Sequence, residues 1–250
     1  MTLFPTRFLL RGRGLWALAA LLLCGAAQAQ EAVIRKNLAE RLPTLPKIDE
    51  VSRTPIAGVF EVRFGGTEIL YTDATGDHVF AGAALIDTKT RTDLTEARVN
   101  KLLAIDFDKL PLKDALVFKQ GTGARKMAVF ADPNCGFCKR FERDIAGMKD
   151  ITIYTFLVPI LGADSATKSR DIWCAKDAGR AWRAWMLDNA TPPKTAANCD
   201  SAAVERNLEY SKKNRINGTP VVVFEDGSRK VGAIPVDAIE RLLLAAAKKS

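Results

Sequence analysis

The pattern of apolar and polar positions divides the chain into two parts. Apolar residues recur at helical spacing over residues 31–43. They then alternate with polar residues over 59–64, and a Gly-Gly turn leads to a returning strand at 67–72. A second turn precedes a third predicted strand over 78–86. The first part, residues 30–91, is therefore predicted to be a small α+β unit with one helix and an antiparallel meander.

Beyond residue 113, predicted strands alternate with helices, which indicates an α/β layered domain over 113–250. The predicted strands are 127–131, 151–158, 220–224 and 229–232, and the predicted helices are 136–148, 165–187, 200–213 and 236–248. Between the two parts, within residues 92–112, apolar and charged residues form a helical pattern over 94–105. Such a linker helix would span roughly 18 Å and could hold two domains apart.

The first 29 residues have the layout of a secretory signal. A basic start with Arg7, Arg11 and Arg13 precedes an apolar run, and Ala27-Gln28-Ala29 supplies small residues for cleavage after Ala29. One alternative is a permanent membrane anchor, but the apolar run is short for a bilayer span. Another is lipid attachment at Cys24, although Leu23 stands where a lipoprotein signal has a small residue.

Composition narrows the class of protein. The chain is 48% apolar, as expected for a globular protein, and its net charge is +8. Loss of three arginines and no acid with the signal would leave about +5, spread along the chain without a basic block interleaved with aromatics. We therefore expect no nucleic-acid partner. The four remaining cysteines form an even set, which suits an oxidising compartment.

The first part is thin for an independent domain. About sixty residues bury little apolar surface, and this segment contains no disulfide or metal cluster to supplement its core. Exposed meander edges also favour pairing with a second chain. Residues 30–91 are therefore predicted to dimerise.

The candidate chemistry is a C-x-x-C motif, Cys135-Gly136-Phe137-Cys138, between a predicted strand and the start of a helix. Unpaired N–H groups and the helix dipole favour a thiolate there, so we expect the pKa of Cys135 to lie below about 8.5. Lys139 and Arg140 add positive charge. Cys135 is the predicted attacking thiolate, and Cys138, one turn deeper, is predicted to resolve the mixed disulfide.

The alternatives for this pair are a zinc site and a plain structural disulfide. Zinc needs about four ligands, and no second closely spaced pair of cysteines exists. His78, the only histidine, lies in the first part and is predicted to be structural. A structural disulfide is rarely placed at a helix start beside a buried strand. We therefore favour redox chemistry with no metal and no cofactor.

A second motif, Gly218-Thr219-Pro220, precedes the predicted strand at 220–224. Proline is allowed at the first residue of a strand, and an X-Pro bond can be cis. An ordinary turn proline is the alternative. In a thioredoxin-like fold such a loop lies beside the C-x-x-C, and its backbone pairs with extended substrate. We therefore expect Thr219, Pro220, Gly136 and Phe137 to contact substrate.

Three stretches of the sequence and the domain order resemble those of a known family. The stretches Phe130–Lys139, Asp171–Lys176 and Gly218–Pro220, together with the domain order, are similar to periplasmic disulfide isomerases of the DsbC/DsbG type. The resemblance implies a thioredoxin-like fold with an inserted helical segment, preceded by a small α+β (cystatin-like) dimerisation domain and a linker helix. It also implies a V-shaped homodimer in the periplasm, kept reduced by a membrane electron donor of the DsbD type.

The motif departs from its relatives in ways that bear on the assignment. Gly136-Phe137 replaces the usual Gly-Tyr of the C type, and Lys139 stands where that type often has histidine. The histidine of strong DsbA-type oxidants and the proline of the G type are both missing from the motif. The first two departures leave the redox assignment intact, and the missing histidine and proline favour an isomerase.

The remaining cysteines, Cys174 and Cys199, are predicted to form a structural disulfide. The favoured function is a disulfide isomerase or reductase that reshuffles misfolded, disulfide-containing secreted proteins. Two alternatives stay open: a dedicated thiol reductase acting on sulfenic acids or cytochrome-maturation cysteines, and a chaperone that works without its thiols.

Overall fold

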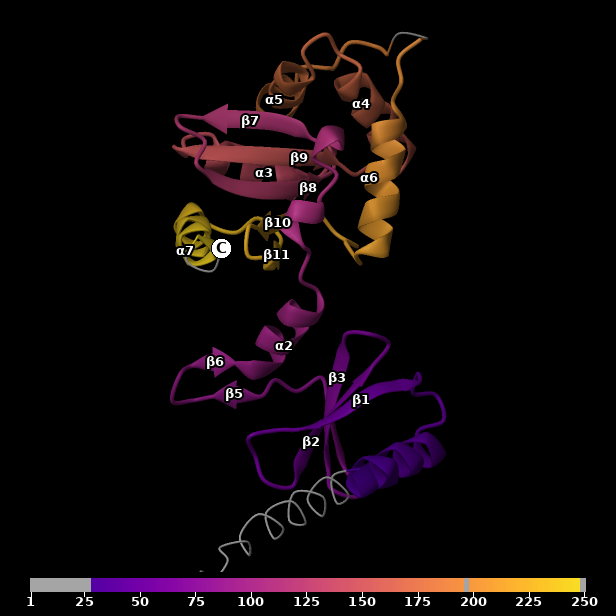
Figure 1. The fold of residues 1–250 in the computed structure, drawn as a ribbon. Helices are drawn as coiled ribbons and strands as arrows, with labels where there is room; N and C mark the ends of the chain where they lie inside the picture. The colour runs from indigo at the N-terminus through magenta and orange to yellow at the C-terminus, as the bar shows by residue number, and fades with distance from the viewer. Residues whose placement is uncertain (1–27, 196–197, 248–250) are drawn as a thin grey trace, which may run out of the picture. The chain divides into compact units, whose positions relative to one another are not determined.

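The computed structural model describes residues 28–195 and 198–247. The chain separates into two compact units, one ending at Leu102 and the other beginning at Leu103 (Figure 1). The predicted signal lies almost wholly outside the described residues. Within them, no helix is both long and apolar enough to cross a membrane.

The first unit is one helix packed on an antiparallel sheet. The helix, described over residues 28–41, buries Ile34 and Leu38 against Ile48, Val62 and Leu70. Four strands follow in the order β1-β2-β3-β4: β1 Ile48–Arg53, β2 Val59–Phe64, β3 Glu68–Asp73 and β4 Val79–Ala81. The small α+β domain with one helix and a meander is thus confirmed in outline.

Two details of the meander differ from the prediction. The third predicted strand, 78–86, is wrong in extent, because β4 has three residues and Gly82 leaves the strand with φ +68°. Ile86 belongs instead to β5 (Ile86–Asp87), which pairs with β6 (Thr92–Asp93). The strand β1 was not predicted, because only one of its six residues is buried and its position is fixed by backbone pairing with β2.

The connecting helix is shorter than predicted. Helix α2 spans Leu94–Leu102 and buries none of its residues. Arg98 ties it to the sheet of the first unit through Glu50 at 2.6 Å and Glu61 at 3.0 Å. After it, Phe107 and Leu110 are buried in a core cluster of the second unit. The predicted linker 92–112 is therefore divided, since its second half packs as part of the C-terminal fold.

The second unit is built on a five-stranded mixed sheet. Its strands are β7 Leu116–Gln120, β8 Arg125–Ala131, β9 Ile151–Leu157, β10 Val221–Phe224 and β11 Arg229–Val231, in the order β11-β10-β8-β9-β7. The central strands β8 and β9 are parallel, and the other neighbours are antiparallel. The strand β7 was not predicted, because it is short and sits at an edge with Val117 exposed.

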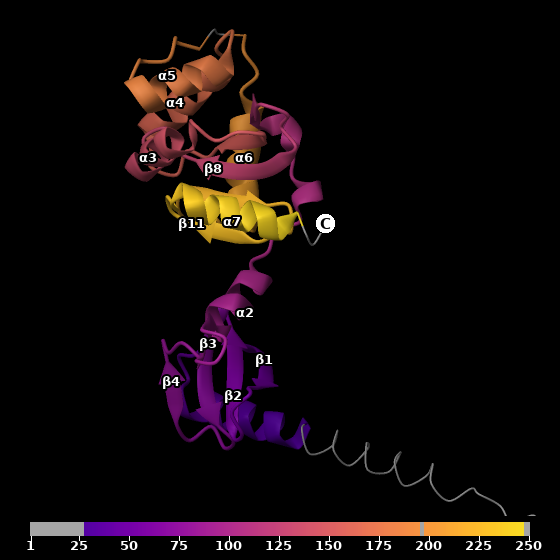
Figure 2. The ribbon, with the colours of Figure 1, turned by 90° about the vertical axis from the view of Figure 1, so that its left-hand side faces the viewer.

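Helices cover both faces of this sheet. On one face, the core includes side chains of α3 (Gly136–Ile145), α5 (Ala178–Asp188) and α7 (Val236–Ala246). The other face packs against α6 (Ala202–Lys213) and the segment around Phe107. Figure 2 turns the molecule by 90° and shows α7 side-on, with α6 behind β8. The predicted thioredoxin-like α/β layering is confirmed.

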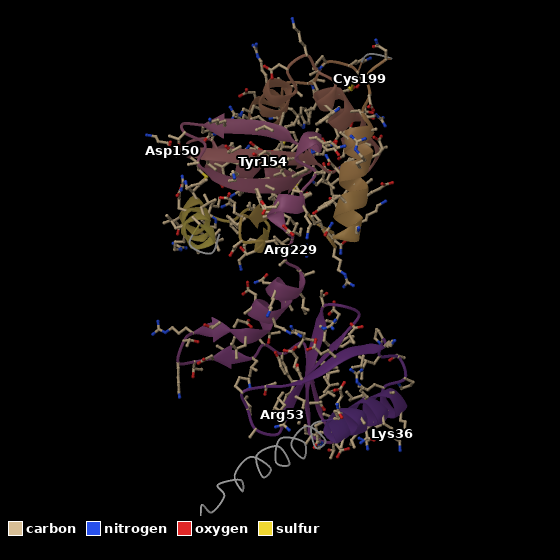
Figure 3. All side chains as sticks on the ribbon, in the orientation of Figure 1. Lys36, Arg53, Asp150, Tyr154, Cys199 and Arg229 are labelled. Atoms are coloured by element: carbon tan, nitrogen blue, oxygen red, sulfur yellow. A yellow bond between two sulfur atoms is a disulfide. The ribbon has the colours of Figure 1, made fainter. Side chains whose placement is uncertain are left out.

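The inserted helical segment consists of two helices rather than the single one predicted over 165–187. Helix α4 (Ala163–Trp173) ends at Cys174, and α5 restarts with Asp177, whose side chain accepts a hydrogen bond from the Arg180 N–H. Cys174 is joined to Cys199, labelled in Figure 3. The break turns the chain so that α4 and α5 pack against each other.

Candidate active site

Cys135 lies at the N-terminus of α3, directly after the central strand β8. It is the N-cap residue of the helix, and its sulfur accepts a hydrogen bond from the Cys138 N–H with an N···S distance of 3.3 Å. A backbone turn holds it there, because its own N–H donates to the Asp132 carbonyl at 3.1 Å. An amide hydrogen at this position stabilises negative charge on the sulfur. This is the geometry that the C-x-x-C spacing predicts.

Cys138 lies one turn further along α3 and is 1% exposed. Burial raises the pKa of its thiol well above the usual range, and the neighbouring Cys135 raises it further. The two thiols are not bonded to each other. The pair therefore combines a capped sulfur at the helix end with a second, protonated sulfur in the core.

The loop before β10, which contains Thr219 and Pro220, lies next to Cys135. The Cys135 Sγ donates to the Thr219 carbonyl at 3.3 Å, and the bond between Thr219 and Pro220 is cis. Phe137 stands at the surface of the motif, 66% exposed, next to the exposed Gly136. The structure thus brings Thr219 to Cys135 across 84 residues of sequence.

A buried aspartate organises the loop before the motif. Asp132 accepts hydrogen bonds from the Asn134 N–H at 2.7 Å, the Ser165 hydroxyl at 2.8 Å and the Leu161 N–H at 3.0 Å. It thereby ties the turn at Cys135 to the start of α4. The sequence does not single out Asp132, because two of its three partners, Leu161 and Ser165, lie about thirty residues away.

Trp185 packs beside the same loop, and two lysines lie on its ring. Its indole N–H donates to the Pro133 carbonyl at 2.6 Å. The Lys139 ammonium is 3.9 Å and the Lys168 ammonium 4.9 Å from the ring centre. Trp185 thus brings two cations together near the motif.

Glu142 is a further buried group on α3, one turn beyond Cys138. Its carboxylate accepts a hydrogen bond from the Trp182 indole at 2.8 Å. Burial raises the pKa of Glu142, while that bond and the Arg183 charge act in the opposite direction. A glutamate following a C-x-x-C in the sequence gives no sign of burial, so it was not predicted.

Among residues 28–195 and 198–247, no three or more His, Cys, Asp or Glu side chains lie together as potential metal ligands. His78 is exposed, and its Nδ1 lies 2.7 Å from the Asp73 carboxylate in the turn before β4. That interaction holds the pKa of Asp73 well below its usual range. His78 thus contacts a turn aspartate in the first unit.

Both units match known families. Residues 25–96 match the disulfide bond isomerase protein N-terminal domain, and residues 112–247 match the thioredoxin-like domain. The probable thiol:disulfide interchange protein DsbC of Bordetella parapertussis is 44% identical over 218 residues, covering 87% of this chain and 76% of that protein. The chain belongs to the DsbC family of thiol:disulfide interchange proteins.

A more distant DsbC protein and a solved structure also match this chain. The thiol:disulfide interchange protein DsbC of Escherichia coli K12 is 27% identical and covers 88% of this chain and 89% of its own. A solved disulfide interchange protein from Neisseria gonorrhoeae is 34% identical, with a TM-score of 0.51, over 55% of this chain and 98% of its own. Membership of the DsbC family makes this chain an enzyme of thiol:disulfide interchange.

Proposed function

We propose that this DsbC-family chain is a periplasmic protein disulfide isomerase that also reduces disulfides, with Cys135 as nucleophile and Cys138 as resolving thiol. The observation that carries the proposal is the capped sulfur of Cys135, which accepts the Cys138 N–H and faces the Thr219 carbonyl. The Cys138 N–H can stabilise the thiolate that forms when Cys135 loses its proton, and an extended substrate can pair with the neighbouring backbone.

The reaction follows from the difference between the two thiols. The Cys135 thiolate attacks one sulfur of a wrong disulfide, forming a mixed disulfide and releasing the other substrate sulfur as a thiolate. That substrate thiolate can attack another disulfide of the client and free a different client thiolate. A client thiolate then attacks the client sulfur of the mixed disulfide, which forms a new client disulfide and releases Cys135 as a thiolate. Alternatively Cys138 loses its proton and attacks Cys135 Sγ, leaving a Cys135–Cys138 disulfide and a client reduced by two electrons. The raised pKa of Cys138 slows its attack on the mixed disulfide and therefore favours isomerisation over reduction.

The proposal extends to partners and location. The proposed clients are secreted proteins with non-native disulfides, and a membrane donor of the DsbD type returns the oxidised pair to the dithiol. Similarity to DsbC proteins supports a periplasmic location and a homodimer joined through residues 30–91. Within the described first unit, β4 is an edge strand with Val79 and Phe80 exposed, which supports an interface there.

Substitution of each cysteine separately tests the roles. Cys135→Ser should abolish reduction of insulin, because the attacking sulfur is gone. Cys138→Ser should accumulate mixed disulfides with clients, because only the resolving step is lost. An insulin reduction assay measures the first effect, and non-reducing gels of periplasmic extracts followed by mass spectrometry measure the second. Equal residual activity in the two variants, with neither trapping a client, contradicts the assignment.

Refolding of a scrambled multi-disulfide substrate separates the alternatives. An isomerase restores native pairing and loses this activity when both cysteines become serine. A chaperone keeps its effect in the double variant. A dedicated reductase lowers the number of substrate disulfides without increasing native pairing.

A further inference from the structure

Next to the proposed nucleophile, two lysine ammonium groups share the ring of Trp185. Lys139 Nζ lies 3.9 Å and Lys168 Nζ 4.9 Å from the ring centre. Because the face of an indole ring is electron-rich, it attracts cations and holds both of them in place. The two ammonium groups nevertheless repel each other. An anion bound between them would reduce this repulsion.

The two cations differ in how far they are neutralised. Lys168, with its side chain 19% exposed, forms an ion pair with Asp164, which also accepts from the Asn134 amide. Lys139 has no carboxylate partner among residues 28–195 and 198–247; its ammonium donates to the amide oxygen of Asn189 at 2.5 Å. Burial lowers the pKa of Lys139, and the Lys168 and Arg143 charges lower it further. Partial burial of a cation without a counter-charge is unfavourable, and an anionic ligand would supply that counter-charge.

The cluster is fixed to the loop that carries Cys135. Lys139 lies in the first turn of α3, four residues after the N-cap Cys135, and its N–H donates to the Cys135 carbonyl at 3.0 Å. This hydrogen bond closes the first turn of the helix and keeps Lys139 one turn from the nucleophile. The Trp185 indole, in turn, donates to Pro133, two residues before Cys135. A substrate sulfur attacked by Cys135 would therefore have its neighbouring groups within reach of the lysines.

We propose that Lys139, supported by Lys168 and Trp185, forms a subsite that selects disulfides with a carboxylate close to the sulfur under attack. The proposal rests on the function proposed above and adds a substrate class to it. In protein clients the matching group is an aspartate or glutamate beside the cysteine. Among small molecules it is a carboxylate-bearing disulfide such as glutathione disulfide.

The reaction used to test this is balanced by the enzyme dithiol itself. Cys135 attacks a disulfide RSSR, forming Cys135–S–S–R and releasing RS⁻; Cys138 then attacks Cys135 Sγ and releases the second RS⁻. The protons of the two enzyme thiols go to solvent or to the released thiolates. One enzyme dithiol is oxidised for each disulfide reduced, so no other reductant is needed.

The experiment compares three disulfides in single turnovers of the reduced full-length protein. Glutathione disulfide is anionic, cystamine is cationic, and bis(2-hydroxyethyl) disulfide is neutral and serves as the reference. The reaction is quenched in acid, and released thiols are quantified by mass spectrometry. Dividing each rate by the neutral rate removes any change in the nucleophile itself, so the two ratios report only charge selection.

We expect wild type to favour the anionic over the cationic disulfide, and Lys139→Gln to reduce that preference about three- to tenfold. Lys139→Arg should retain it, and 0.5 M salt should weaken it in wild type. Arg140→Gln is the matched control: it removes the same charge one position along α3, where Asp144 already pairs with the arginine.

The proposal is overturned if Lys139→Gln leaves the preference unchanged, or if Arg140→Gln lowers it as much, because the effect is then one of net charge. It is also overturned if wild type shows no preference while reducing all three disulfides. Failure of the proposed function has a different signature, since then even the neutral disulfide is not reduced.

Discussion

At the scale of single residues, Asp132 accepts three hydrogen bonds close to the candidate nucleophile. Its carboxylate is buried and accepts from two backbone N–H groups and the Ser165 hydroxyl. In Asp132→Asn, one carboxylate oxygen becomes an NH₂ group that cannot accept a hydrogen bond, so at least one buried donor loses its partner. We expect a loss of about 1–3 kcal/mol in the free energy of unfolding.

Urea denaturation measures this loss, and Asp164→Asn provides the control. Asp164 is exposed and joined to Lys168, so its replacement should cost at most about 1 kcal/mol. Equal losses in the two variants would mean that Asp132 does not organise the loop.

Glu142 gives a prediction about pH. Because burial raises the pKa of Glu142, the unfolded chain releases this proton at a lower pH than the folded protein. The folded state is therefore penalised progressively as pH rises from the ordinary carboxyl range through the raised value. Glu142→Gln removes the ionisation, so the stability of the variant relative to wild type should increase between about pH 4 and pH 8.

Denaturant unfolding at both pH values checks this trend, with Glu209→Gln, an exposed glutamate on α6, as the matched control. A difference between Glu142→Gln and wild type that stays constant with pH would show that Glu142 is charged in the core at no cost.

At the scale of elements, the disulfide closes the inserted helical segment. Cys174 at the end of α4 is bonded to Cys199, 25 residues later, so the loop contains α5 and the chain leading to α6. Closing a loop of this length stabilises the fold by about 3.5 kcal/mol in the chain-entropy model, whose mechanism is disputed. The double variant Cys174→Ser, Cys199→Ser should lose about this much stability and keep its fold.

Differential alkylation and mass spectrometry of protein taken from the periplasm determine whether this bond forms in vivo. Two unmodified thiols at Cys174 and Cys199 would refute it. The single variants are poor substitutes, because each leaves a free thiol that can exchange with the Cys135 pair.

At the scale of the whole molecule, we expect dimerisation to matter more for isomerisation of disulfides than for their simple reduction. Phe80 is 57% exposed on the edge strand β4, and we expect Phe80→Asp to yield monomers. Such a monomer should reduce insulin as before, because the geometry at Cys135 is local to the second unit. Refolding of a multi-disulfide substrate should fall roughly tenfold or more, because two linked sites raise the effective concentration of client disulfides.

Light scattering measures the mass, and Ile56→Asp, an exposed apolar residue outside β4 in the same unit, is the control. A dimeric Phe80→Asp variant places the interface elsewhere, and a monomeric one that isomerises like wild type removes the need for a dimer. A truncated chain should begin at Leu103 rather than near 112, because Phe107 and Leu110 belong to the core of the second unit.

The local chemistry and the order of elements could be predicted from the sequence alone. Helix and strand periodicities are set by neighbouring residues, which is why the first helix, β2, β3, β8, β9 and α6 were predicted within a few residues. The C-x-x-C before a helix is also a local signal, because helix capping involves only residues within one turn. Family membership followed from three short stretches of sequence.

Only the tertiary structure determined what depends on distant partners. The strands β1 and β7 are held by pairing with their neighbours rather than by a strong pattern of their own. Contacts with α4 and α5 determine the burial and the polar partners of three features: Asp132, Glu142 and the Lys139–Trp185–Lys168 cluster. Charge, hydrogen bonding and burial at such sites depend on which side chains meet in space, and the fold alone decides that.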